Sequence, residues 1–173
     1  MKPIRYLIII LSFNVYADEK EQIYGDWRAG IISSDSIVFA YANTTNESES
    51  TLGILCLNDS VTCVPYLLNG LRCEEGGEYP ILVAIDDGVV SVDAGCLHIE
   101  DRHLFTLPDD HIEYMATMNR YSVAYGTETG KFIAAYFSLN GSAKAQIVAK
   151  KLIDSASKSS DENKNLKYED VLL

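Results

Sequence analysis

The sequence predicts a mainly β protein: a single-domain antiparallel sandwich or barrel of about seven to ten strands, with a C-terminal helix and two disulfides. Short runs of β-branched and aromatic residues are separated by turn-forming residues roughly every eight to twelve positions. All four cysteines lie between residues 56 and 96. The strongest helical pattern lies near the C-terminus.

The N-terminus has the layout of a cleavable secretory signal. Lys2 and Arg5 precede a short apolar run, and Ala17 stands just before a charged segment. The apolar run is too short to anchor the chain in a bilayer. We therefore predict a signal peptide at 1–17, no integral membrane segment after cleavage, and a periplasmic or secreted protein.

Nine runs are predicted as strands from their β-branched and aromatic content and from the turn residues between them. They cover residues 26–32, 36–42, 51–57, 62–68, 79–85, 89–94, 102–107, 121–125 and 131–139. Residues 43–50 are predicted as a polar loop. Pro65 lacks an amide donor, which places 62–68 at a sheet edge or a bulge. Asp86-Asp87-Gly88 predicts a tight hairpin turn.

Two helical patterns follow. A spacing of three between Ile112, Met115 and Met118 predicts a short helix after Pro108. Residues 143–153 are rich in Ala, Lys and Leu and carry an apolar face, which predicts a longer helix. Beyond 154 polar residues dominate. The predicted organisation is therefore a signal at 1–17, a β-rich domain with its terminal helix at 18–154, and a flexible polar tail at 155–173.

An even number of cysteines in an exported chain predicts disulfides, with three possible connectivities. The spacings contain neither a zinc knuckle nor a C-x-x-C redox motif. Cys56 and Cys63 flank a short turn between two predicted strands, within reach of each other. That leaves Cys73 to pair with Cys96 across the 79–94 hairpin.

No arrangement of catalytic or metal-ligating residues stands out. His98, His103 and His111 are irregularly spaced, and residues 98 and 103 fall on opposite faces of a regular strand. We found neither a nucleophile elbow nor a phosphate-binding glycine loop. We therefore expect no metal, no cofactor and no enzymatic activity; the alternative is a small periplasmic hydrolase.

The charge of the chain favours a protein partner. The net charge is −11, and removal of Lys2 and Arg5 with a signal that contains no acid changes it to −13. Such a protein is repelled by nucleic acid and attracts cationic partners, although solubility alone also explains the charge. The predicted binding residues lie in two acidic loops: Glu47, Glu49, Glu74, Glu75 and Glu78. An alternative role is that of an inhibitor or immunity protein for a cationic secreted enzyme or toxin.

The eleven tyrosines exceed what a small aliphatic core requires. Several of them, including Tyr41 and Tyr66, fall in predicted strands. Tyrosine is favoured both on half-buried sheet faces and at recognition surfaces, so this pattern fits either role.

Two segments resemble the invasion-associated locus B family of exported bacterial proteins. They are Gly25-Asp26-Trp27, just past the signal, and 137–145, which leads into the last helix. Gly53-Ile-Leu-Cys56 is similar in kind, whereas Ala29 stands where the family has an early cysteine. The resemblance implies a β-rich periplasmic or surface domain that is linked to host-cell invasion and has no established enzymatic activity. No functional residue of this chain is assigned from the resemblance.

Overall fold

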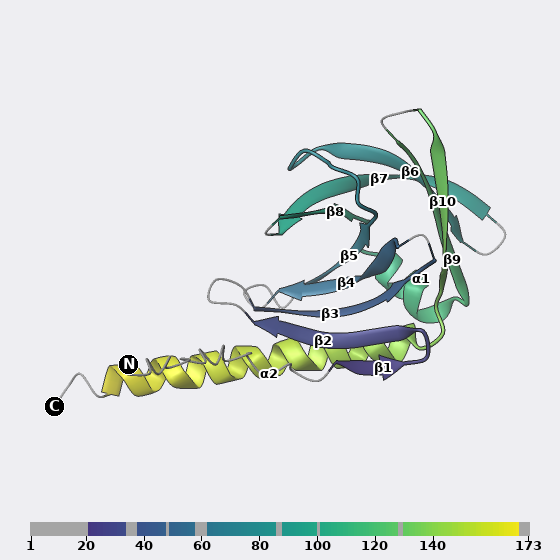
Figure 1. The fold of residues 1–173 in the computed structure, drawn as a ribbon. Coiled ribbons are helices and arrows are strands. Elements are labelled where there is room, and N and C mark those ends of the chain that lie inside the picture. The colour runs from purple at the N-terminus through teal and green to yellow at the C-terminus, as the bar shows by residue number, and fades with distance from the viewer. Residues whose placement is uncertain are drawn as a thin grey trace, which may run out of the picture.

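A computed structural model describes residues 21–33, 38–47, 49–57, 62–85, 88–99, 101–127 and 130–169 (Figure 1). The predicted signal and the turn residues Asp86 and Asp87 lie outside these ranges. The strands and helices are β1 (Gln22–Tyr24), β2 (Trp27–Ser33), β3 (Val38–Thr45), β4 (Thr51–Leu57), β5 (Cys63–Leu68), β6 (Glu78–Ile85), β7 (Gly88–Ile99), β8 (Arg102–Thr106), α1 (His111–Thr117), β9 (Arg120–Gly126), β10 (Phe132–Ser138) and α2 (Ser142–Glu169).

The strands form one antiparallel sheet of ten strands in the order β1-β2-β3-β4-β5-β8-β7-β6-β9-β10. It curls into a half-barrel, with α2 along β1, β2 and β3 and with β9 and β10 rising from the other end (Figure 1). The predicted fold class is confirmed, with a curled single sheet as the specific architecture. The β6–β7 hairpin is also confirmed, because Ile85 pairs with Gly88 across a two-residue connection.

The predicted polar loop at 43–50 begins too early. Strand β3 continues to Thr45, which pairs with Thr51 of β4, and the two threonine hydroxyls lie 2.9 Å apart. A cross-strand pair of threonines is a favourable β contact, so the polar composition of 43–45 does not end the strand.

The prediction that Pro65 places β5 at a sheet edge or a bulge is wrong, because β5 lies between β4 and β8 and pairs with β4 in continuous register. On the β8 side only Tyr66 and Leu67 are in register. The Pro65 carbonyl accepts a hydrogen bond from the Leu107 amide, 2.9 Å away and just past the end of β8. The amide and the carbonyl of a strand residue point toward the same neighbouring strand. The amide hydrogen that Pro65 lacks would therefore point toward β8, at the position where the pairing of β5 with β8 ends.

One face of the sheet forms the main core beneath α2. Every second residue of a strand faces this core, and Ala40 and Ala42 of β3 share it with Ala145, Ala149 and Ile153 of α2. The small alanines let the helix lie close to the strands. The helical backbone continues to Glu169, well past Ile153, so residues that we assigned to the polar tail extend α2. The mobility of 155–173 stays a prediction.

The β1–β2 turn is fastened to the connection between β10 and α2, a region that we call the closure corner. The Trp27 indole donates to the Ser138 carbonyl at 2.8 Å, and the Ser138 hydroxyl donates to the Asp26 carboxylate at 2.6 Å. The Asp26 amide donates to the Asn140 carbonyl at 3.0 Å. These bonds join segments more than 110 residues apart in the chain and so bring the two ends of the curled sheet together.

Two glycines permit the backbones to approach closely at this corner. Gly25 and Gly141 have φ of 60° and 92°, where side chains are strained. A Cβ on Gly141 would lie 1.8 Å from the Tyr24 carbonyl oxygen, and one on Gly25 would lie 2.6 Å from the Asn140 carbonyl oxygen. Both segments that carry the family resemblance therefore meet at this corner, where they hold the fold together.

The two predicted disulfides are confirmed. Cys56 and Cys63 are directly opposite each other on β4 and β5, and Cys73 joins Cys96 of β7. The first bridge reinforces a hairpin, whereas the second fastens the segment between β5 and β6 onto the sheet. Within the described ranges, no helix is both long and apolar enough to span a membrane.

Candidate functional site

The sheet face opposite α2 carries a second apolar cluster, which we call the open face. Leu55, Tyr66 and Leu104 are buried at its centre. Phe39, Tyr41, Leu57, Leu68, Leu97 and Ile99 surround them. All nine residues come from β3, β4, β5, β7 and β8, and no residue of α1 or α2 belongs to the cluster.

The open face contains a groove of about 270 Å³. Phe39, Leu55 and Leu104 supply much of its apolar lining, while the exposed Arg28 and Arg102 bring charge to its border. The ring of Tyr41 lies over Gly30, its partner on β2, because a Cβ at residue 30 would come within 2.8 Å of the Tyr41 hydroxyl. The absence of a side chain at Gly30 thus places Tyr41 in the groove.

The polar atoms of the groove are paired with each other. The Tyr41 hydroxyl donates to the Glu21 carboxylate at 2.9 Å, and Arg28 lies 3.7 Å from the same carboxylate. On the neighbouring strands, the Asn43 amide donates to the Tyr66 hydroxyl at 3.0 Å. The groove is therefore an apolar surface with a small number of oriented polar groups, the composition typical of binding sites.

Both tyrosines stay neutral well beyond physiological pH. Burial raises the pKa of Tyr66 to about 12, against the opposing effect of the hydrogen bond from Asn43. Burial, together with the neighbouring Glu21 carboxylate, raises the pKa of Tyr41 to about 12. The two side chains therefore present hydroxyl groups, not phenolates, to the groove.

The five glutamates of the predicted binding loops are all exposed, but they do not line this groove. Glu47 and Glu49 lie between β3 and β4, and Glu47 lines a hollow near β10 together with Asp26 and Tyr136. Glu74 and Glu75 lie between β5 and β6, and Glu78 begins β6. Whether these loops bind a partner stays a prediction.

The expectation that His98 and His103 point to opposite faces is wrong. The chain reverses between them, so the two residues are directly opposite each other on β7 and β8. Their side chains meet, with ring centroids 4.3 Å apart. Parity along the chain applies only within one continuous strand, and these two residues lie on different, antiparallel strands. His111 is buried elsewhere, against the Tyr121 hydroxyl.

Sequence reasoning missed the open face as a site, although the sequence held a signal for it. Strand β4 has apolar residues on both of its faces, and all its residues from Leu52 to Cys56 are buried. Such a run indicates a strand that is covered on both faces or that carries an uncovered apolar surface. Here α2 lies on one side, and the second set of apolar residues forms the groove.

No family model and no curated protein matches the chain. A search of solved structures finds the crystal structure of invasion associated protein B from Bartonella henselae, with a TM-score of 0.52 and 13% identity. The match covers 77% of this chain and 97% of that one. The resemblance seen in the closure-corner segments is thus confirmed as a likeness of fold.

Proposed function

We propose that this protein is a non-catalytic binding domain, exported to the bacterial periplasm or cell surface, whose open-face groove takes an apolar anchor of another protein. The observation that carries the proposal is the groove itself. The sheet buries one face under α2 and leaves the other with nine clustered apolar side chains. Contiguous apolar surface of this kind, with polar residues at its border, is typical of interaction sites.

The charge of the chain favours a cationic partner. The sequence has 25 acidic and 14 basic residues, and an excess of this size steers positively charged proteins toward it. The groove border itself contains Arg28 and Arg102, so the attraction would come from the rest of the surface, including the acidic loops. We infer a division in which the loops raise the association rate and the groove sets the dissociation rate.

Export and invasion rest on other observations. The predicted signal and the two disulfides support an oxidising compartment. The structural neighbour from Bartonella henselae is an invasion associated protein, which supports an invasion-associated role for this one. An inhibitor of a cationic secreted enzyme would use the same surfaces, and the identity of the captured partner distinguishes the two roles.

The groove can be tested with a matched pair of phenylalanine variants. Phe39 lies in the open-face cluster, whereas Phe132 is 76% exposed on β10, outside the groove. Each variant, Phe39→Ser and Phe132→Ser, serves beside the wild type as bait against periplasm and culture supernatant of the native host. A partner identified by mass spectrometry is then purified for kinetics. We expect Phe39→Ser to weaken its binding at least about tenfold and Phe132→Ser to leave it unchanged.

Equal binding by both variants would contradict the groove. The acidic loops are tested separately by reversing Glu47 and Glu49 in one variant and Glu74, Glu75 and Glu78 in another. The expected result is a slower association with a weaker dependence on salt, because exposed charges are screened over about 8 Å at physiological ionic strength. Turnover of peptidoglycan, ester or phosphate substrates, abolished by a single alanine substitution, would overturn the non-catalytic reading.

A further inference from the structure

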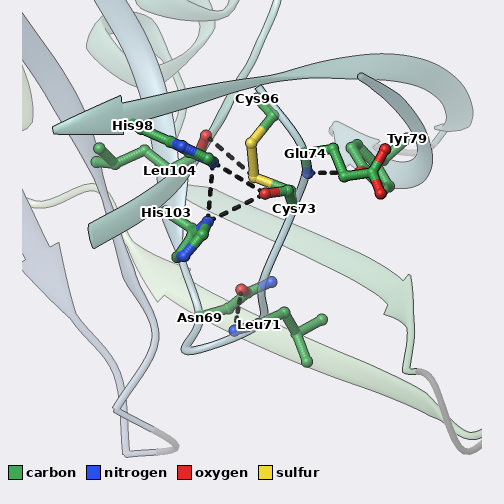
Figure 2. The surroundings of a disulfide bond; sticks show 9 residues. All are labelled: Asn69, Leu71, Cys73, Glu74, Tyr79, Cys96, His98, His103 and Leu104. Atoms are coloured by element: carbon green, nitrogen blue, oxygen red, sulfur yellow. Dashed lines mark hydrogen bonds between the residues drawn. A yellow bond between two sulfur atoms is a disulfide. The ribbon is translucent and has the colours of Figure 1, made fainter. Parts of the chain in front are cut away.

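Three potential ligand atoms converge where the β7–β8 hairpin meets the segment after β5. His98 Nε2 lies 2.9 Å from the Cys73 carbonyl oxygen, His103 Nδ1 lies 3.0 Å from it, and the two nitrogens are 2.9 Å apart. Figure 2 shows the two imidazoles and the carbonyl facing one another beside the Cys73–Cys96 disulfide. Both histidines are half-buried.

Hydrogen bonding cannot satisfy all three contacts at once. A carbonyl oxygen only accepts, and each neutral imidazole nitrogen either donates or accepts. If both nitrogens donate to Cys73, two N–H groups face each other at 2.9 Å. If one nitrogen donates to the other, the acceptor nitrogen faces the carbonyl oxygen, and two lone pairs oppose each other. One contact of the triangle is therefore repulsive in either neutral arrangement.

A metal ion removes this conflict, because all three atoms then direct lone pairs toward one point. Nitrogen ligands lie about 2.0–2.1 Å from ions such as Zn²⁺, which puts neighbouring ligand atoms roughly 2.8–3.0 Å apart in an octahedral site and roughly 3.3–3.4 Å apart in a tetrahedral one. The three observed separations lie in the octahedral range. Imidazole nitrogens suit Zn²⁺, Cu²⁺ and Ni²⁺.

The fold holds the three atoms in place without an ion. His98 and His103 are a cross-strand pair with ring planes 77° apart, so the rings cannot stack and their edges meet. The disulfide to Cys96 fastens Cys73, and the Gly76 amide donates to the Cys96 carbonyl at 3.3 Å. Preorganisation of this kind lowers the ordering cost of binding.

We propose that His98 Nε2, His103 Nδ1 and the Cys73 carbonyl oxygen bind one divalent first-row transition-metal ion while the Cys73–Cys96 disulfide is intact. The cysteine sulfurs, although close to both histidines, are bonded to each other and supply no thiolate. The three protein atoms leave the other coordination positions to water or to a side chain of another molecule. The site is independent of the open-face groove, which occupies the opposite face of the sheet.

The test uses the untagged chain with both disulfides formed, verified by the absence of titratable thiols. Calorimetry with Cu²⁺, Ni²⁺ and Zn²⁺ should give a stoichiometry of one, with Cu²⁺ bound most tightly, as the usual order of stabilities requires. Zn²⁺ should shift the ¹⁵N resonances of His98 Nε2 and His103 Nδ1 and leave those of His111 in place. His98→Gln and His103→Gln should each weaken binding at least about tenfold.

The NMR experiment uses wild-type protein, so it remains decisive if a variant fails to fold. His111 is an internal control in the same spectrum, because it lies against Tyr121 away from the cluster. The proposal is overturned if none of the three ions binds with a stoichiometry of one, or if His98→Gln and His103→Gln each bind the ion as tightly as wild type. Binding that appears only after reduction would assign the ion to the cysteine thiolates and also overturn it.

Discussion

The closure corner and the open face differ in what determines their residues. At the corner, the Asp26 amide bonds the Asn140 carbonyl, the Trp27 indole bonds the Ser138 carbonyl, and Gly141 leaves no room for a Cβ. On the open face, apolar side chains line a groove, and many residues of similar volume would fill the same positions. The residues of the corner are thus restricted by close backbone approach, and those of the open face by their apolar character.

The solved structure of invasion associated protein B shares this fold at 13% identity. The two sequence segments that carried the resemblance both lie at the closure corner, where few substitutions are compatible with the chain path. Under the proposed function, the search for a partner starts from the open face and the surface charge.

Substitution of Trp27 in the closure corner should give the largest decrease in the free energy of unfolding. Trp27 is fully buried, and its indole bonds the Ser138 carbonyl. Trp27→Ala should lower the free energy of unfolding by about 3–5 kcal/mol, because it removes a large buried side chain and leaves a cavity. Urea unfolding followed by circular dichroism measures the change.

A second substitution at this residue separates packing from hydrogen bonding. Trp27→Phe retains much of the apolar volume but removes the indole donor, and we expect a loss of about 1–3 kcal/mol. If Trp27→Ala costs no more than Phe39→Ser on the open face, the contrast between a stabilising corner and a binding face is wrong.

The two disulfides should rank next and differ from each other. The Cys73–Cys96 bridge closes a separation of 23 residues and the Cys56–Cys63 bridge one of 7, which corresponds to about 3.4 and about 2.4 kcal/mol of lost unfolded-chain entropy. Paired alanine substitutions of each bridge, compared by urea unfolding, test this order. Because neither bridge lies in the closure corner, the corner hydrogen bonds should persist in both variants. A larger loss for the 56–63 pair would contradict the chain-entropy argument.

The sequence was sufficient to predict most strands, both helices and both disulfides, since these depend on local composition and on hairpin connectivity. The sequence was insufficient to predict features that depend on which strands lie next to each other in the sheet. An interior strand can accommodate Pro65 only because β8 ends beside that residue. His98 meets His103 only because the two residues lie opposite each other on neighbouring antiparallel strands. The groove belongs to the same class, because it needs residues of five strands on one face.

The groove should also respond to alkaline pH. Burial raises the pKa of Tyr66 to about 12, above the value of about 10 in an unfolded chain. The folded state thus favours the protonated hydroxyl, and the stability that this burial contributes is complete below pH 10 and is lost as the pH rises toward 12. The loss for this residue is at most about 2.7 kcal/mol. Absorbance at 295 nm and urea unfolding should show a smaller alkaline loss in Tyr66→Phe than in wild type.

The opposite side of the sheet should show a smaller effect, at acid pH. His111 is buried against the Tyr121 hydroxyl, and burial lowers its pKa, although Asp110 at 3.9 Å favours the charged form. Because the folded pKa lies below the unfolded value of about 6.5, the contribution of neutral His111 to stability is complete above pH 6.5 and is lost as the pH falls toward the folded pKa. Wild type should therefore lose more stability than His111→Gln between pH 7.5 and 5. A ¹⁵N titration should place the His111 midpoint below 6.5. A midpoint above 6.5 would mean that the attraction of Asp110 outweighs burial, and that the core side of the sheet is less well shielded from solvent than its packing indicates.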